Sequence, residues 1–243
     1  MRIVTAEAAR KIDHDAMNVR GVPGIGLMAA AGKAVANAAL DICRREKRSR
    51  VQVFCGKGNN GGDGFVAAAE LKKAGIRNID VFSFAGTDTL RGDAKHHFER
   101  MEDSGVKAQI VSDVQALRPL LKNDACWIDA IFGTGLNRPV EGFLRDVMEL
   151  LREAHCEQPV IAVDIPSGIH GTNGRLLGPA LKARITVCIG FYKTGNFLQD
   201  GRSYCGLLQG AGLDYPAASL NMPCRRSGCA GMRKYNNACI PYR

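Results

Sequence analysis

The stretch Val51–Leu71, VQVFCGKGNNGGDGFVAAAEL, indicates the fold class of this chain. The apolar run 51–55 predicts a strand, 65–71 predicts a helix, and the glycine-rich segment 56–64 joins them. Such a turn brings backbone N–H groups and the positive end of a helix dipole close to a phosphate. The two asparagines and Asp63 exceed what a phosphate cradle needs, and they indicate chemistry or ion binding beside a nucleotide.

The same segment also fits the dinucleotide-binding fingerprint, as Gly56-x-Gly58-x-x-Gly61. That fingerprint expects an acidic residue at the end of the second strand, where it binds a ribose hydroxyl. The second predicted strand, 79–84, ends without an acid, and Asp80 lies too early in it. An ordinary NAD-dependent dehydrogenase is therefore disfavoured.

The composition is that of a soluble α/β protein, with 243 residues, 46% hydrophobic and 23% charged. No apolar run approaches the roughly 20 residues that span a bilayer. The polar segment 1–10 has no signal-peptide core, and we expect a cytoplasmic protein. Cys55, Cys126 and Cys188 lie in apolar strand-like runs, where buried reduced thiols are expected.

The net charge of +9 is unevenly distributed. Residues 216–243 contain five basic and no acidic residues, which leaves about +4 for residues 1–215. A mildly basic body suits an anionic nucleotide and does not itself indicate nucleic-acid binding. The tail has three cysteines without zinc-finger spacing. We expect one domain over 1–215, followed by a disordered segment or truncated linker over 216–243.

Predicted strands and helices alternate along the body of the chain. Two helices come first, over 6–17 and 26–45. Strands are then predicted at 51–55, 79–84, 107–111, 126–132, 159–164 and 184–190, and helices at 63–74, 90–103, 113–121 and 141–155. This alternation predicts a parallel sheet covered on both faces, with ligands bound beyond the carboxyl ends of the strands.

Polar segments follow three of these strands, at the ends where ligands bind. They are the loop Asn59–Asp63, the segment Asp129–Leu136 (DAIFGTGL) and the segment Asp164–Gly168 (DIPSG). A further segment, 190–195, adds Lys193. This lysine is expected either to approach the substrate or the strand-end cluster, or to be exposed on the surface.

These three motifs, in this order and spacing, resemble the YjeF N-terminal domain family, which are NAD(P)H-hydrate epimerases. The resemblance runs from about Ala6 to Tyr215. It implies a Rossmann-like three-layer α/β/α sandwich with a mostly parallel central sheet and N-terminal helices. It also implies interconversion of the R and S forms of NADHX or NADPHX, which are hydrated at C6 of the nicotinamide ring. An S-specific dehydratase that uses ADP or ATP then restores the cofactor.

The resemblance also implies roles for individual residues. Asp164 is the expected acid–base carboxylate, with a turn-capping aspartate as the alternative. One potassium ion per subunit is implied at Asn60, Asp129 and Ser167, and a metal-free hydrogen-bonded cluster is the alternative. The implied nucleotide contacts are Asp164 with Asn59, Asn60, Gly61, Gly62, Asp63, Gly133, Thr134, Gly135, Leu136, Asn137, Arg138 and Pro139, although 133–135 also reads as a flexible turn.

One departure from the family pattern stands in the second predicted helix. The family's Leu-Met-Glu-Asn-Ala-Gly reads Leu27-Met28-Ala29-Ala30-Ala31-Gly32 here, so two polar side chains are missing. Substrate affinity or N-terminal packing is expected to differ. Family members form homodimers, which makes a dimer possible, and no nucleic-acid or membrane partner is expected. A non-catalytic nucleotide-binding or scaffold module remains the alternative function.

Overall fold

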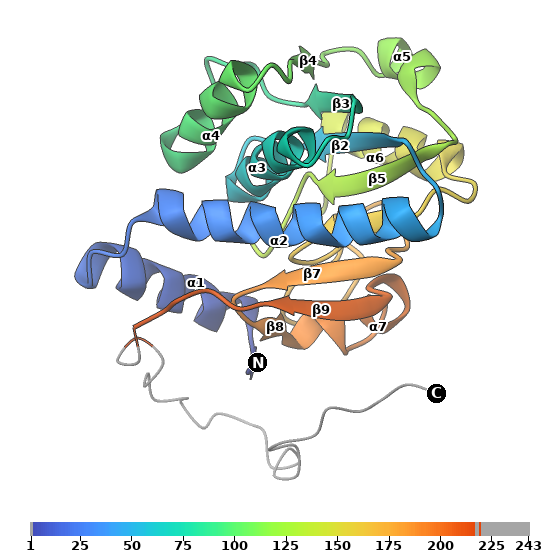
Figure 1. Cartoon of the computed structure of the whole chain (residues 1–243). Helices are drawn as coiled ribbons and strands as arrows, with labels where there is room; N and C mark the ends of the chain where they lie inside the picture. Colours follow the sequence, from blue (N-terminus) through green and yellow to red (C-terminus); the bar gives the residue numbers. More distant parts are fainter. Residues whose placement is uncertain (1, 217–218, 220–243) are drawn as a thin grey trace.

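The computed structural model describes residues 2–216 and 219, so the expectations for the tail lie outside the described residues apart from two positions. A seven-stranded, all-parallel sheet forms the centre, in the order β4-β3-β2-β5-β6-β7-β9 (Figure 1). Its strands are β2 (Arg50–Cys55), β3 (Asn78–Ser83), β4 (Ala108–Ile110), β5 (Ala125–Ala130), β6 (Val160–Val163), β7 (Ile185–Ile189) and β9 (Leu207–Ala211). The six predicted strands are confirmed, with small differences at their ends.

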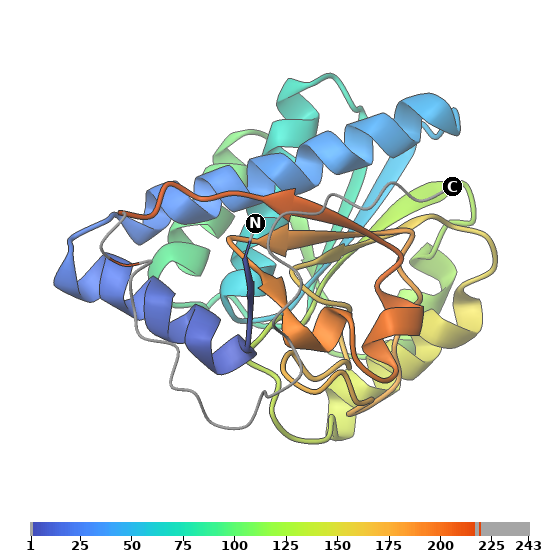
Figure 2. The same ribbon diagram turned by 90° about the horizontal axis from the view of Figure 1, so that it is seen from below.

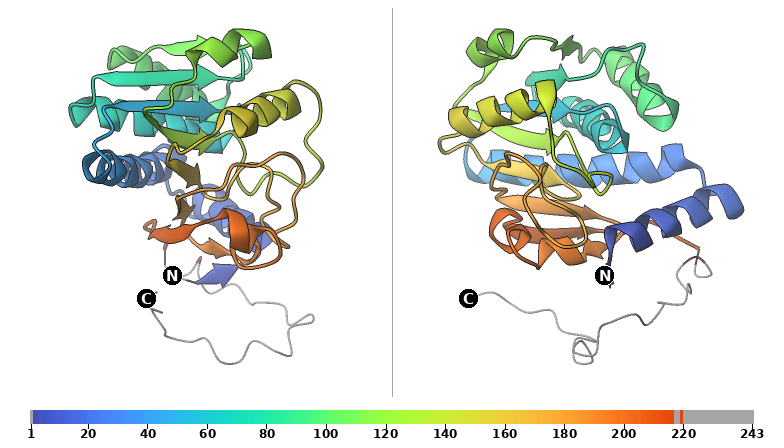
Figure 3. Two further views of the ribbon diagram at one scale, coloured as in Figure 1. Left: turned by 90° about the vertical axis from the view of Figure 1, so that its right-hand side faces the viewer. Right: turned by 180° about the vertical axis from the view of Figure 1, so that it is seen from behind.

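Helices cover both faces of this sheet (Figures 1 and 3). On one face lie α2 (Gly24–Arg45), α3 (Asn59–Lys73) and α4 (Gly92–Asp103). On the other lie α5 (Val114–Leu117), which runs into the 3₁₀ turn Arg118–Leu120, and α6 (Gly142–Ala154). Each face has its own hydrophobic core, because parallel strands present apolar side chains in both directions. The predicted three-layer sandwich is confirmed.

The N-terminal segment lies beside the chain that follows β7 (Figure 2). Helix α1 (Ala6–His14) runs into a π-helical turn at Asp15–Val19. Before it, β1 (Ile3–Val4) pairs in parallel with β8 (Tyr192–Lys193). Strands this short carry no readable periodicity, and they were not predicted. Also unpredicted were the 3₁₀ turn Thr194–Asn196, helix α7 (Gly201–Tyr204) and the partly exposed strand β9.

The predicted loop Asn59–Asp63 is wrong, because helix α3 already begins at Asn59. The glycines there meet a need for close packing. A Cβ built on Gly61 would lie 1.9 Å from the carbonyl oxygen of Gly56, and one on Gly62 would lie 2.5 Å from the sulfur of Met28. Glycine is a weak helix former, so these residues lower the intrinsic stability of the first turn of α3. In return, the absence of a side chain lets the helix begin directly against the preceding turn.

Helix α2 packs as a core helix. By length and composition it is the one helix among the described residues that could cross a membrane, which the sequence analysis did not anticipate. Val35, Ala39 and Ile42 of α2 are buried in the core on this face of the sheet. The expected buried, free thiols of Cys55, Cys126 and Cys188 are confirmed in the same interior.

Candidate functional site

The strand order predicts a ligand-binding crevice at the carboxyl ends of β2 and β5. Successive strands run outward in one direction from β2 to β3 and β4, and in the other from β5 to β6, β7 and β9. The two connections that leave the carboxyl ends of β2 and β5 therefore diverge, and such a switch point is where open parallel sheets bind ligands. The two turns meet closely, since a Cβ on Gly56 would lie 2.1 Å from the carbonyl oxygen of Ile131.

Asp129 and Ser167 join the ends of β5 and β6. The backbone N–H of Ser167 donates to Oδ2 of Asp129 at 2.8 Å, and the Ser167 hydroxyl donates to Oδ1 at 2.5 Å. The same hydroxyl accepts the backbone N–H of Phe132 at 2.8 Å. Burial raises the pKa of Asp129, and the bonds from Ser167 partly oppose that rise.

Asn60 approaches the same connection from the first turn of α3. Its Oδ1 would lie 2.8 Å from a Cβ built on Gly133, so a larger residue there would displace the Asn60 side chain. Its Nδ2 is buried and has no hydrogen-bond partner among the described residues. A buried polar group without a partner points to something missing from the protein alone, such as an ion or a ligand.

The oxygen atoms of Asn60, Asp129 and Ser167 therefore gather around the peptide that joins Phe132 and Gly133. They offer an amide, a carboxylate and a hydroxyl oxygen. Such all-oxygen sets suit hard cations. The donor chemistry thus fits the ion expected from the sequence, while the Asp129–Ser167 hydrogen bonds match the metal-free alternative equally well.

Asp164 follows β6 in a strained backbone conformation. Its φ of 71° lies in the left-handed region, which is uncommon for a residue other than glycine. Its backbone N–H donates to the carbonyl of Val187 at 2.8 Å, which fixes the turn against β7. Strain of this kind costs about 1–3 kcal/mol and is concentrated at functional sites.

Lys193 forms a buried ion pair with Asp164, and this settles the open question of its position. Its side chain is 2% exposed, and Nζ bonds Oδ1 of Asp164. Nζ also donates to the carbonyl oxygens of Ile189 at 2.7 Å and Phe191 at 3.0 Å. The three protons of an ammonium group are thereby all used, and Lys193 has no further donor to offer a ligand.

The two oxygens of Asp164 have different surroundings. Oδ1 accepts from Lys193 and from the backbone N–H of Ile189 at 3.2 Å. Oδ2 has no hydrogen bond to any described residue and lies 3.4 Å from the position of a Cβ on Gly133. The carboxylate is thus held by one oxygen and presents the other towards the crevice between β2 and β5.

Asp63 adds a second buried carboxyl to the site. It lies in the first turns of α3 and is 8% exposed. Burial raises its pKa well above the ordinary value, and the negative charge of Asp164 raises it further. Burial thus favours the neutral form of this carboxyl over its charged form.

A hollow of about 300 Å³ opens beside the connection that follows β5. It is lined by Phe132, Gly135, Leu136, Asn137 and Arg138. Helix α1 supports this segment, because the Arg10 guanidinium donates to the carbonyl of Thr134. Asn137, Arg138 and Pro139 are exposed, so they are accessible to a ligand.

The remaining predicted positions lie on α2 and α3. Met28 of α2 packs on Gly62, so α2 borders the first turn of α3. Ala29 is half-buried and Ala30 is exposed, so the substituted pair lies outside the packed core. Sequence reasoning missed Asp13 and Tyr215, whose contacts join chain segments more than 200 residues apart and leave no local pattern.

A parallel sheet with polar side chains at its switch point is typical of Rossmann-like ligand-binding proteins. The family described as YjeF-related protein N-terminus matches residues 24–195. The chain belongs to this family.

Relatives with known names share most of the chain. An NAD(P)H-hydrate epimerase from Limosilactobacillus fermentum is 35% identical over 203 residues, 84% of this chain and 92% of the relative. A bifunctional NAD(P)H-hydrate repair enzyme Nnr from Thermofilum pendens is 37% identical over 222 residues, 90% of this chain. The chain spans only 41% of the length of that bifunctional relative. The crystal structure of yeast ynu0 (YNL200c) superposes with a TM-score of 0.72 at 26% identity, over 86% of this chain and 87% of the yeast chain.

Proposed function

We propose that this protein is an isomerase that interconverts the R and S forms of hydrated NADH and NADPH at C6 of the nicotinamide ring. The observation that carries the proposal is the buried Lys193–Asp164 pair, which leaves one carboxylate oxygen directed at the switch-point crevice. Relatives named NAD(P)H-hydrate epimerase, similar over most of their length, support the same activity.

The nucleotide part of the substrate would bind across the crevice. The first turn of α3, at Asn59–Gly61, presents backbone N–H groups and the positive end of a 15-residue helix to the pyrophosphate. The 133–139 segment borders the hollow on the other side, and Arg138 there can make a charge-assisted contact. The nicotinamide ring would then face Asp164.

Epimerisation requires the C6 hydroxyl to leave and water to add on the opposite face of the ring. In the proposed reaction, the carboxylate of Asp164 first takes up a proton from water on Oδ2. That proton passes to the C6 hydroxyl as the C6–O bond breaks, which releases water and leaves a ring iminium. Water then adds to the other face, its proton passes to Oδ2 and from there back to solvent, so atoms and charge balance. Lys193 holds Oδ1 and orients the carboxylate without exchanging a proton itself.

A potassium ion bound by the oxygens of Asn60, Asp129 and Ser167 is part of the proposal. When bound, it would neutralise Asp129 and supply a fixed positive charge near the anionic substrate. The donor set supports this ion, because an amide, a carboxylate and a hydroxyl oxygen suit a hard cation. The proposed setting is cytoplasmic, with a separate ADP- or ATP-dependent dehydratase as functional partner and a homodimer as the assembly.

The activity is tested by adding R-NADHX, an S-specific dehydratase and ATP, and following NADH recovery with and without this protein. Spontaneous epimerisation sets the background rate. Acceleration by the wild type that Asp164→Asn abolishes is the expected result. Asp124→Asn is the matched control. Asp124 is exposed and lies just before the first residue of β5, whereas the site lies at the carboxyl end of that strand.

The alternative, a binding or scaffold module of the same fold, predicts a different outcome. Binding of NADPH or NADHX would then be measurable by calorimetry, while the wild type would not accelerate epimerisation. The buried ion pair argues against this alternative, because a buried lysine and aspartate are costly to maintain where binding alone is needed.

A further inference from the structure

Tyr215 contacts helix α1 and the turn that precedes Lys193. Its hydroxyl donates to Oδ1 of Asp13 on helix α1 at 2.5 Å. Its ring stacks on Phe191, with centroids 5.3 Å apart and planes inclined by 15°. It also fills the space beside Gly190, where a Cβ would lie 2.7 Å from the tyrosine oxygen. One side chain thus joins α1 to the turn between β7 and β8.

That turn supplies two of the three acceptors of the catalytic-site lysine. The carbonyl oxygens of Ile189 and Phe191 flank Gly190 and both accept from Nζ of Lys193. Gly190 has a φ of 67°, a left-handed conformation that glycine adopts readily. The Phe191 ring that Tyr215 contacts and the carbonyl that accepts from Lys193 belong to the same residue, so a contact on the ring can restrain that carbonyl.

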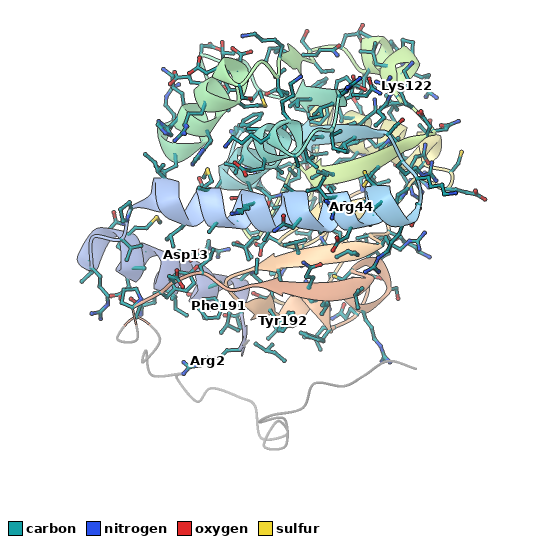
Figure 4. All side chains as sticks on the ribbon, viewed as in Figure 1. Arg2, Asp13, Arg44, Lys122, Phe191 and Tyr192 are labelled. Atoms are coloured by element: carbon teal, nitrogen blue, oxygen red, sulfur yellow. The ribbon has the colours of Figure 1, made fainter. Side chains whose placement is uncertain are left out.

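Helix α1 packs on the same turn through apolar contacts. Ala9 and Ile12 form a small cluster with Phe191, and Tyr215 packs against it. In Figure 4, Asp13 lies on α1 and Phe191 lies beyond the end of β7, on the same side of the molecule. Burial raises the pKa of Asp13, while the hydrogen bond from Tyr215 opposes that rise. The Asp13–Tyr215 pair is therefore partly buried and electrostatically coupled to Lys193 and Asp164.

We propose that Tyr215 and Asp13 are positioning residues, which set the Ile189–Lys193 turn and thereby the orientation of the Lys193–Asp164 pair. This inference rests on the proposed epimerase function for its effect on turnover. It assigns a role to Tyr215, which follows strand β9, and to Asp13 of helix α1. No substrate contact was expected from either segment.

The test uses Tyr215→Phe, which keeps the ring on Phe191 and removes only the hydroxyl, together with Asp13→Ala, which removes the acceptor, and the double variant. We expect kcat to fall about fivefold to tenfold in each single variant, as the loss of one hydrogen bond to a charged group allows, with KM unchanged. The double variant should be no slower than the slower single variant, because both substitutions break the same contact. Tyr204→Phe is the control, since the Tyr204 ring packs elsewhere, near Lys182.

Hydrogen exchange of residues 185–196, read by mass spectrometry on the full chain, separates this inference from the proposed function. Faster exchange in Tyr215→Phe, together with the lower kcat, is the expected result. Unchanged exchange overturns the positioning role whether or not the protein is active, and so does faster exchange with unchanged kcat. A wild type that is inactive refutes the epimerase proposal. In that case, faster exchange in Tyr215→Phe still supports the structural contact, and unchanged exchange overturns it.

Discussion

Replacement of Lys193 by methionine tests the centre of the site most directly. Methionine keeps most of the buried stem and removes the ammonium group. Asp164, 7% exposed, then loses its counter-charge, and the carbonyls of Ile189 and Phe191 lose their shared donor. Removal of one partner from a buried pair costs about 3–5 kcal/mol, and two partnerless carbonyls place this case at the upper end. That is a large part of the roughly 5–15 kcal/mol that holds a domain together.

The free energy of unfolding is measured by urea denaturation for the wild type, Lys193→Met, Asp164→Asn and the double variant. The double variant removes the unpaired charge, so it should regain more than half of the stability lost in Lys193→Met. Neither single variant should support epimerisation above background. Lys122→Met is the control: Lys122 is exposed and lies at the far end of the molecule from Asp13 and Phe191 in Figure 4.

Two results would refute this reasoning. A loss below about 1 kcal/mol in Lys193→Met would be typical of an exposed ion pair and would contradict the buried one. A double variant as unstable as Lys193→Met would show that the lost stability comes from packing of the stem. In either case, the assignment of Oδ2 as the reacting oxygen would lose its support.

Three further predictions test the surroundings of this pair. Gly61→Ala should lower the free energy of unfolding, measured by urea denaturation, by about 3 kcal/mol or more, because its Cβ would meet the Gly56 carbonyl. Gly58→Ala is the control and should lower it by less than about 1 kcal/mol, because a Cβ at Gly58 would lie in open space. Asp63→Asn should stabilise the protein increasingly as pH rises. A carboxyl whose folded pKa is raised contributes stability that is fully present below its unfolded pKa and is lost as pH rises from there through the folded pKa. Equal gains at pH 5 and pH 8 would contradict this. Potassium should raise the wild-type melting temperature relative to N-methylglucamine at equal ionic strength. Ser167→Ala should be about 1–2 kcal/mol less stable than the wild type, because it loses the hydrogen bonds of the serine hydroxyl, and its melting temperature should not rise with potassium.

The sheet and its ligand-binding edge could be predicted because they depend on local patterns. Alternating apolar runs and helix-forming runs define the strands, and the parallel topology then places their carboxyl ends together. The predicted loop at Asn59–Asp63 was wrong for a physical reason. Glycine usually indicates a turn, but Gly61 and Gly62 provide clearance for Gly56 and Met28, a property of packing that the sequence does not reveal.

The site was predictable only in part, because its remaining contacts join distant segments. Asp164 and Ser167 could be found as polar residues after a strand. The burial of Lys193 depends on the pairing of β8 with β1 near the N-terminus, and on the Asp164 turn. The Tyr215–Asp13 bond spans 202 positions along the chain. Contacts between residues so far apart in the sequence determine which polar residues lie in the site, and the hydrophobic periodicity of the sequence does not predict such contacts.

The charge balance of the site explains how a crevice with three carboxyl groups can accept an anionic nucleotide. Lys193 compensates Asp164, and burial raises the pKa of both Asp63 and Asp129. The compensation of Asp164 reduces the negative charge that would repel a pyrophosphate, and the raised pKa values of the other two carboxyls act in the same direction. The Lys193 contact also holds Asp164 in a fixed geometry. Loss of Lys193 would therefore weaken substrate binding as well as catalysis, because an uncompensated charge would face the nucleotide.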